Sequence, residues 1–288
     1  MLQHDSKTFR PLGAIEETRS GRLFLDENGI SPDFPLLVID DSRVKRLIEN
    51  ETGVGQSVVD GFLRQTSMLL GGKKVLVIGY GYCGRGISQR HRALGAVTYV
   101  YDTDNIAMLK AKVEGHIVGK LEDVLPLAEM VITVTGRFHV LGLKHVPYLR
   151  DNCIIANAGH YNMEIDIADL KKESESVTTL QDGIEELLIG GKRINILQKG
   201  NPLNLSSGAG NPIEIMELGY ALQLLSLEVI VKDKTLKPGI QGLPESVEQE
   251  AVGQRWICKN QVNYSIVSSD KENITNITQK TALISYIV

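Results

Sequence analysis

The stretch that most constrains the fold is residues 73–102. It begins with a short apolar run, VLVI, which is typical of a parallel strand buried on both faces. Three glycines follow directly in a GxGxxG pattern: Gly79, Gly81 and Gly84. A polar helical segment comes next, and a second apolar run then ends on Asp102. This order predicts a strand, a tight turn, a helix and a second parallel strand.

Each feature of that unit has a defined chemical use in dinucleotide binding. The first glycine bends the chain, the second lets the backbone approach a pyrophosphate, and the third lets helix and strand pack closely. The helix N-terminus supplies N–H groups and a positive dipole end to the phosphates. An acid at the position of Asp102 accepts hydrogen bonds from the adenosine ribose and repels a 2′-phosphate. We therefore predict an NAD-binding domain that disfavours NADP. A glycine-rich turn that holds no ligand is the alternative.

The alternation of strands and helices continues along the chain. Further strands are predicted at 34–39, 116–118, 130–135, 153–157, 177–180, 184–188 and 193–197. Helices are predicted up to Asn50, at 57–70, 106–113 and 121–128, with a glycine-bearing break at 52–55. This pattern predicts an α/β fold with a Rossmann-type doubly wound parallel sheet. The last three strands either complete that sheet or form an antiparallel edge.

Composition excludes several classes of function. The net charge is −4 and no block of Lys and Arg stands out, so nucleic acid is not expected as a partner. The cysteines Cys83, Cys153 and Cys258 lack the spacing of metal ligands, and we expect no metal site. The first ten residues have no apolar signal core. These features favour a cytoplasmic protein without disulfides.

Residues 212–231 form a different kind of element, because the segment is apolar nearly all round. Its acids Glu214, Glu217 and Glu228 argue against a membrane span. Such a helix is buried on several sides, either in a core or at a subunit interface. We favour the interface, and hence a homo-oligomer formed through 212–231.

Several sequence blocks in a fixed order reveal a family resemblance over roughly residues 13–231. They are GAIEETRSG at 13–21, the stretch from Asp41 through Lys45, Glu49, Asn50 and Gly53 to Gly61, VIGYGYCGRG at 77–86, and NAGHYNMEID at 157–166. TVTG at 133–136 and NLSSGAGNP at 204–212 also occur in the expected order. In these blocks the chain resembles the cofactor-binding half of the S-adenosylhomocysteine hydrolases, or adenosylhomocysteinases.

The resemblance implies a specific chemistry. That family uses bound NAD transiently: it oxidises a ribose 3′-hydroxyl, eliminates homocysteine, adds water and reduces the ketone again. By resemblance Glu17 binds the ribose diol, Lys45 helps to remove the 3′-hydroxyl proton, Glu49 replaces an aspartate and His160 lies near the 3′-oxygen. The residues implied at the nicotinamide end of the cofactor are Asn50, Thr18, Thr133, Thr135 and Asn204.

The same residues can be interpreted without the family. A lysine serves as a base for an alcohol proton if its surroundings lower its pKa towards neutrality. Glu49 lies at i+4 from Lys45 and can orient it or relay the proton. His160 follows a parallel strand, at the edge where doubly wound sheets bind ligands. The alternatives are an exposed i,i+4 ion pair and a loop histidine with a structural partner.

The sequence also departs from the family pattern. A long segment precedes the first block in the family, whereas twelve residues precede Gly13 here. Val54 replaces a cysteine, Asn211 replaces a histidine before Pro212, and Arg19 and Ser20 replace two threonines. The family's C-terminal tail has no recognisable match in 259–288. We therefore expect residues 1–56 to be a remnant of the substrate-domain region carrying active-site residues, 57–211 to be the NAD domain, and 212–288 to be the long helix with an extension.

Three functions are consistent with these observations. The first is an NAD-dependent oxidoreductase that oxidises a secondary hydroxyl of a sugar- or nucleoside-like small molecule with vicinal hydroxyls, without full hydrolase activity. The second is a non-catalytic NAD sensor or partner-binding subunit. The third is one half of a split S-adenosylhomocysteine hydrolase, with another polypeptide supplying the missing substrate domain. Retention of Glu17, Lys45, Glu49 and His160 favours the first.

Overall fold

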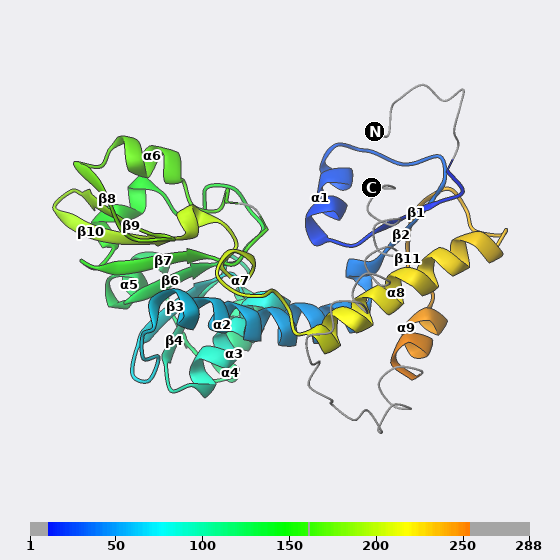
Figure 1. The fold of residues 1–288 in the computed structure, drawn as a ribbon, viewed down its shortest axis with the longest axis horizontal. Coiled ribbons are helices and arrows are strands. Elements are labelled where there is room, and N and C mark those ends of the chain that lie inside the picture. Colours follow the sequence, from blue (N-terminus) through cyan, green and yellow to red (C-terminus); the bar gives the residue numbers. More distant parts are fainter. Residues whose placement is uncertain (1–10, 161, 254–288) are drawn as a thin grey trace, which may run out of the picture. The chain divides into compact units, whose positions relative to one another are not determined.

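The computed structural model describes residues 11–160 and 162–253 (Figure 1). The described residues up to Ala251 belong to one compact unit. The segment 259–288 lies outside the described residues.

An eight-stranded sheet is the main element of the fold (Figure 1). Its strands, in spatial order, are β5 (Ile117–Val118), β4 (Val97–Tyr101), β3 (Lys74–Ile78), β6 (Met130–Thr133), β7 (Cys153–Asn157), β10 (Lys192–Leu197), β9 (Ile184–Ile189) and β8 (Ser176–Gln181). The first six strands are parallel to one another. Strand β9 pairs antiparallel with both of its neighbours, β10 and β8. The parallel part has the order of a doubly wound dinucleotide-binding sheet, with its switch point between β3 and β6. The predicted fold class is confirmed.

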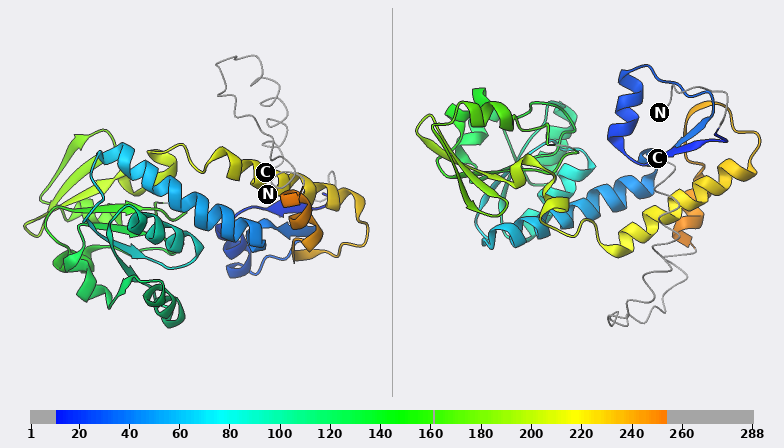
Figure 2. Two further views of the ribbon diagram at one scale, coloured as in Figure 1. Left: turned by 90° about the horizontal axis from the view of Figure 1, so that it is seen from below. Right: turned by 45° about the horizontal axis from the view of Figure 1, so that its top comes forward.

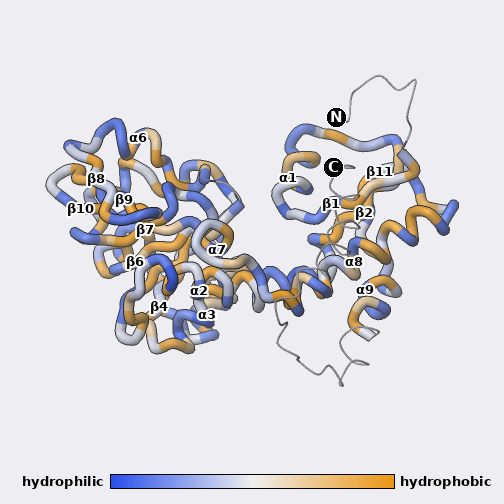
Figure 3. Tube along the Cα trace, viewed as in Figure 1, coloured by the Kyte–Doolittle hydropathy of each residue, from blue (hydrophilic) through white to orange (hydrophobic). Residues whose placement is uncertain are grey.

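The central strands β3, β6 and β7 are buried on both faces, and their residues are accordingly almost all apolar (Figure 3). Alternate residues of β3 enter different cores: Val75 and Val77 pack with Val58 and Ile87, whereas Leu76 and Ile78 pack in the other cluster. The helices that bound the parallel strands are α2 (Val54–Thr66), α3 (Tyr82–Ala93), α4 (Asn105–Val113), α5 (Leu121–Val124), α6 (Ile167–Lys172) and α7 (Leu203–Ser206).

A second, smaller sheet joins the two ends of the described chain. Its parallel strands lie in the order β1 (Ala14–Glu16), β2 (Pro35–Val38) and β11 (Gly239–Gly242). The helices connected to these strands are α1 (Arg19–Glu27), α8 (Ile213–Lys232) and α9 (Glu245–Val252), of which α1 and α8 can be followed in Figure 2. Segments assigned by sequence to 1–56 and 212–288 therefore share one sheet.

The predicted break at 52–55 is wrong. A π-helical segment, η2 (Lys45–Gly53), continues directly into α2. The glycines in this region allow close packing instead of ending the helix: a Cβ on Gly53 would lie 3.1 Å from Asn211 Cγ, and one on Gly55 would lie 2.6 Å from the carbonyl carbon of Gly86. A π-turn carries an extra residue, and such turns are frequent at functional sites.

Helices η2 and α3 cross in very close contact. A Cβ on Gly86 would lie 1.8 Å from the carbonyl oxygen of Glu51, so only glycine allows this approach. Arg85 reinforces the crossing, because its Nη1 lies 3.0 Å from Glu51 Oε2 and its Nη2 2.8 Å from Glu114 Oε1. The η2 part of the continuous helix η2–α2 is thus fixed against α3, the helix that follows the glycine-rich turn.

Helix α8 has one buried and one exposed apolar face. Its buried residues are Ile215, Leu218, Gly219, Ala221, Leu222, Ser226 and Ile230. The exposed ones include Ile213, Tyr220, Leu224 and Val231, each about half exposed or more. No helix in the described part of the chain is long and apolar enough to cross a membrane.

Because the crossing leaves no room at Gly86, we expect Gly86→Ala to destabilise the protein by about 2 kcal/mol or more, despite the better helix propensity of alanine. Gly242→Ala is the matched control, since a Cβ there meets nothing within 4 Å. Its effect should stay within about 0.5 kcal/mol. Urea unfolding followed by circular dichroism measures both, and equal stability of the two variants would contradict the crossing.

Candidate active site

The glycine-rich turn has the geometry needed to receive a pyrophosphate. Gly79 has a φ of +104°, which favours glycine, and a Cβ on Gly84 would lie 1.9 Å from the Gly79 carbonyl oxygen. Gly81, the N-cap of α3, faces open space, with nothing within 4 Å of its missing Cβ. Gly79 and Gly84 therefore allow close packing, and Gly81 leaves the N-terminus of α3 accessible.

Asp102 lies beside this turn, as its position after β4 predicts. Its Oδ2 accepts a hydrogen bond from the Tyr80 backbone N–H at 2.6 Å, and its Oδ1 accepts one from Asp104 N–H at 2.9 Å. Tyr80 is itself held by its hydroxyl, which donates to Glu114 Oε2 at 2.6 Å. The Asp102 carboxylate is thus positioned on the adenosine side of the switch point. Its preference for NAD over NADP stays a prediction.

The carboxyl ends of β6 and β7 lie on the other side of the switch point. The fully buried Thr133 directs its hydroxyl at Asn157 Oδ1, 3.3 Å away. Asn157 Nδ2 donates to the Gly200 carbonyl oxygen at 2.9 Å. Doubly wound sheets bind the nicotinamide half of the cofactor at this edge. Thr133 ends β6 and Thr135 lies two residues beyond it, and their contact with the nicotinamide end of the cofactor stays a prediction.

Sequence reasoning missed Glu164, which organises this edge. Its carboxylate accepts hydrogen bonds from Thr135 N–H at 2.8 Å, Thr135 Oγ1 at 3.0 Å and Gly136 N–H at 2.7 Å. Burial raises the pKa of Glu164, and these hydrogen bonds act in the opposite direction. The acid stands inside the NAGHYNMEID block, but nothing in a single sequence separates it from Asp166 two residues later.

A second cluster brings together the residues predicted to handle the hydroxyl proton. Lys45 Nζ lies 2.5 Å from Glu17 Oε1 and 2.5 Å from Glu49 Oε1. The side chain of Lys45 is 7% exposed, that of Glu49 13% and that of Glu17 30%. The interpretation of Lys45 and Glu49 as an exposed i,i+4 pair is therefore wrong. Glu17 is the most exposed of the three side chains.

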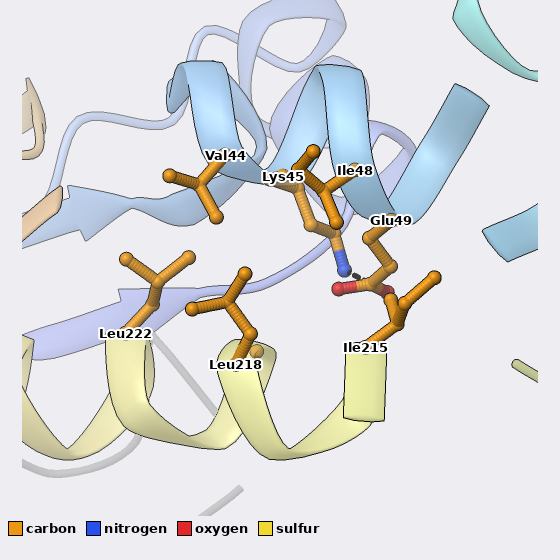
Figure 4. A pocket seen from close by; sticks show the side chains of 8 residues that line it. Val44, Lys45, Ile48, Glu49, Ile215, Leu218 and Leu222 are labelled. Carbon is orange, nitrogen blue, oxygen red and sulfur yellow. Dashed lines mark hydrogen bonds and ion pairs between the residues drawn. The ribbon is translucent and has the colours of Figure 1, made fainter. Parts of the chain in front are cut away.

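Ser42 and helix α8 hold this ion cluster. Ser42 Oγ accepts the backbone N–H of Lys45 at 2.9 Å, which fixes the first turn of the helix. Helix α8 covers Lys45 and Glu49 with Ile215, Leu218 and Leu222 (Figure 4). From the same helix, Gln223 Nε2 donates to Glu17 Oε2 at 2.9 Å, a contact that sequence reasoning did not anticipate.

The pKa values in the cluster differ from the sequence-based expectation. Burial lowers the pKa of Lys45, but the charges of Glu17 and Glu49 outweigh it, and the pKa is raised. The expectation of a lysine poised near neutrality is wrong, because two carboxylates stabilise the ammonium. Burial raises the pKa of Glu17 in spite of Lys45. The buried Glu49 Oε2 has no hydrogen-bond partner among the described residues.

The ion cluster lies close to the glycine-rich turn. Burial raises the pKa of Cys83 in that turn to about 12, and the charges of Asp40, Lys45 and Glu49 also act on it. The Arg46 guanidinium lies 6.0 Å from the centre of the Tyr82 ring. The ion cluster and the start of α3 therefore lie near one another.

The other predicted residues have mainly structural contacts here. Thr18 caps α1, and Asn50 Nδ2 donates to the buried Asp40 at 3.2 Å. The carbonyl oxygen of Asn204 accepts Gly210 N–H at 3.0 Å.

His160 is exposed on the loop after β7. Burial lowers its pKa and the charge of Glu16 opposes this. Within the described ranges, no three His, Cys, Asp or Glu side chains are placed to hold a metal ion.

The strand order, the glycine-rich turn and the acid after β4 define a Rossmann-type dinucleotide-binding protein. Residues 50–210 match the family model described as "S-adenosyl-L-homocysteine hydrolase, NAD binding domain". The chain belongs to the S-adenosyl-L-homocysteine hydrolase family. This match also confirms NAD as the predicted cofactor.

Relatives extend the similarity beyond the NAD-binding domain. The chain is 38% identical over 245 residues to an S-inosyl-L-homocysteine hydrolase of Methanopyrus kandleri, covering 83% of this chain and 58% of the relative. It is 36% identical over 243 residues to an adenosylhomocysteinase of Aquifex aeolicus, covering 83% and 58%. The chain thus spans less than two thirds of the length of these relatives.

Among solved structures, the A chain of dipicolinate synthase from Bacillus subtilis has a TM-score of 0.50 and 13% sequence identity. It covers 77% of this chain and 66% of its own. This likeness concerns the fold alone.

Removing the Lys45 ammonium group from the ion cluster should destabilise the folded protein. Lys45→Met leaves Glu17 and Glu49 facing one another, and we expect a loss of about 3 kcal/mol at pH 7. Lys73→Met is the control, because its pair with Glu129 is about one third exposed and should contribute at most about 1 kcal/mol.

The loss of folding stability caused by Lys45→Met should become smaller as the pH is lowered. Lys45 lowers the pKa of Glu17, so its removal raises that pKa further above the ordinary value of 4.5. The folded state then binds more protons than the unfolded chain, and stability falls as pH rises through this window. Urea unfolding at pH 5 and pH 7 measures the difference. A deficit larger at pH 5 would contradict the proposed electrostatics.

Proposed function

We propose that this protein is an NAD-dependent enzyme that oxidises a secondary hydroxyl of a small molecule with vicinal hydroxyls. The observation that carries the proposal is the buried Lys45 held between Glu17 and Glu49, next to a glycine-rich turn suited to NAD. Buried charges are costly to a fold, so a three-membered ion cluster beside a cofactor site is a strong candidate for chemistry.

Oxidation of a secondary alcohol requires that the hydroxyl lose its proton. The raised pKa of Lys45 keeps the ammonium charged, so it donates to the substrate oxygen and stabilises negative charge there. Lys45 first passes a proton to Glu17 or Glu49, and the neutral amine so formed then accepts the hydroxyl proton, which restores the ammonium beside the alkoxide. Glu17 is suited to receive the proton from Lys45, because burial raises its pKa. NAD, when bound, supplies the acceptor for the hydride from the same carbon.

The proposed class of substrate is based on Glu17, the most exposed residue of the ion cluster. Glu17 is the most exposed of the three, and the two oxygens of a carboxylate can accept hydrogen bonds from two adjacent hydroxyls. The relatives are named after S-inosyl- and S-adenosylhomocysteine, whose nucleosides carry such a diol. A nucleoside or sugar-like diol is therefore the proposed substrate. The elimination and hydration steps of a full hydrolase are outside this proposal.

We expect purified protein supplied with NAD to produce reduced nicotinamide with at least one member of a panel of nucleosides, sugars and cyclitols. The near-ultraviolet absorbance of reduced nicotinamide is the readout. Lys45→Met and Glu17→Gln should each slow this reaction by about a hundredfold or more, as expected for loss of general acid–base catalysis. Both should retain NAD binding, and Lys73→Met should react like the wild type.

The same assay separates the alternatives. S-inosyl- and S-adenosylhomocysteine are included with detection of free thiol. Thiol release without net reduction would indicate hydrolase activity, and its dependence on a co-purifying polypeptide would indicate a split hydrolase. Bound NAD without any turnover would favour the sensor or partner subunit. A wild-type rate in Lys45→Met would refute the proton pathway.

We also propose that the protein is a cytoplasmic homo-oligomer that assembles through the exposed face of α8. Tyr220 is 49% exposed and Leu224 50%, on the side of the helix opposite the buried Leu222. Two such faces can bury one another. Leu224→Glu should then lower the mass measured by sedimentation equilibrium without unfolding the chain. A wild-type protein that sediments as a single copy would contradict the interface.

A further inference from the structure

Glu164 is a buried carboxylate whose hydrogen-bond donors are all neutral groups. Its residue is 2% exposed. Both oxygens accept: Oε1 lies 2.7 Å from Gly136 N, and Oε2 lies 2.8 Å from Thr135 N and 3.0 Å from Thr135 Oγ1. Because each backbone contact comes from an N–H group, the geometry suits the ionised carboxylate, which only accepts. A negative charge is therefore held at this point, and no ion pair to Glu164 occurs within residues 11–160 and 162–253.

The surroundings leave no freedom for this carboxylate to move. A Cβ on Gly159 would lie 1.6 Å from Glu164 Oε1, so the backbone after β7 is packed against the acid. The backbone after β6 is tied to it through Thr135 and Gly136. Glu164 consequently joins the two loops that leave the carboxyl ends of β6 and β7.

Those two loops form the half of the sheet edge that lies beyond the switch point. Asp102 and the glycine-rich turn occupy the half at β3 and β4, which is the adenosine side. By the geometry common to doubly wound folds, the nicotinamide half of a dinucleotide lies at β6 and β7. The nicotinamide ring is positively charged when oxidised and neutral when reduced. A fixed buried anion here interacts differently with the two forms.

We infer that Glu164 makes this site select the oxidised form of its cofactor, NAD, over NADH. It is a positioning residue as well, because it fixes the loop of Thr135. The inference rests on NAD binding and is independent of the substrate proposed above, since the selectivity is a property of binding alone. Its consequence for any reaction at this site is that hydride returns readily from the reduced cofactor to a bound ketone.

The test compares the dissociation constants of NAD and NADH, measured by titration calorimetry after removal of bound nucleotide. Glu164→Gln has the same shape but no charge. We expect it to lower the ratio of the NADH to the NAD dissociation constant at least about tenfold relative to the wild type, because one unit charge in an effective dielectric of about 20 has an effect of that size out to about 12 Å. If Glu164 only positions the loop, both constants change by the same factor and the ratio stays constant, which would overturn the inference.

Two kinds of control accompany this comparison. Glu129→Gln alters a carboxylate that precedes β6, at the opposite edge of the sheet, and should leave the ratio unchanged. Glu164→Asp and Thr135→Val both keep the charge, so both should weaken NAD and NADH equally. These charge-preserving variants decide the matter if Glu164→Gln does not fold: a tenfold loss of selectivity in either would overturn the inference. Failure to oxidise a diol would leave all these ratios unaffected, so the two proposals fail separately.

Discussion

The contact on which the site depends is the crossing of η2 with α3, where Gly86 touches the backbone of Glu51. Helix η2 carries Lys45 and Glu49, and α3 begins at the glycine-rich turn. A side chain at the crossing would separate the helices, and the distance between ion cluster and turn would grow with it. The ion pair of Arg85 with Glu51 strengthens the same contact from the side.

Two buried clusters of charge then give the site opposite properties at its two ends. At Lys45 two carboxylates surround one ammonium, so a proton can be exchanged among three groups. At Glu164 a carboxylate is stabilised by backbone N–H groups and a hydroxyl. Such groups hold an anion without neutralising its net charge. The first arrangement suits proton transfer, and the second suits a cationic ring.

The pairing of β11 with β2 shows how the chain assembles the ion cluster. This small sheet brings residues near the start of the described chain next to residues beyond 238. Helix α8, which precedes β11, covers Lys45 (Figure 4). Its Gln223 also donates a hydrogen bond to Glu17. The segment after the NAD-binding domain therefore belongs to the site, and the match of relatives over 83% of the chain is consistent with this.

The doubly wound sheet and the cofactor turn could be predicted from the amino-acid sequence, because both depend on local patterns. Apolar runs fix the buried strands, and Gly79, Gly81, Gly84 and Asp102 are close together in the chain. The sequence also identified Glu17, Lys45 and Glu49, though through resemblance and not through spacing.

The directions of the pKa shifts of Glu17 and Lys45, the contacts of Glu164 and the continuity of the helix through 52–55 depend on tertiary packing. A pKa depends on burial and on neighbours distant in sequence, as Glu17 is from Lys45. A helix continues through glycines when another backbone packs against them, as Gly86 does against Gly55. Neither condition is visible until the chain has folded.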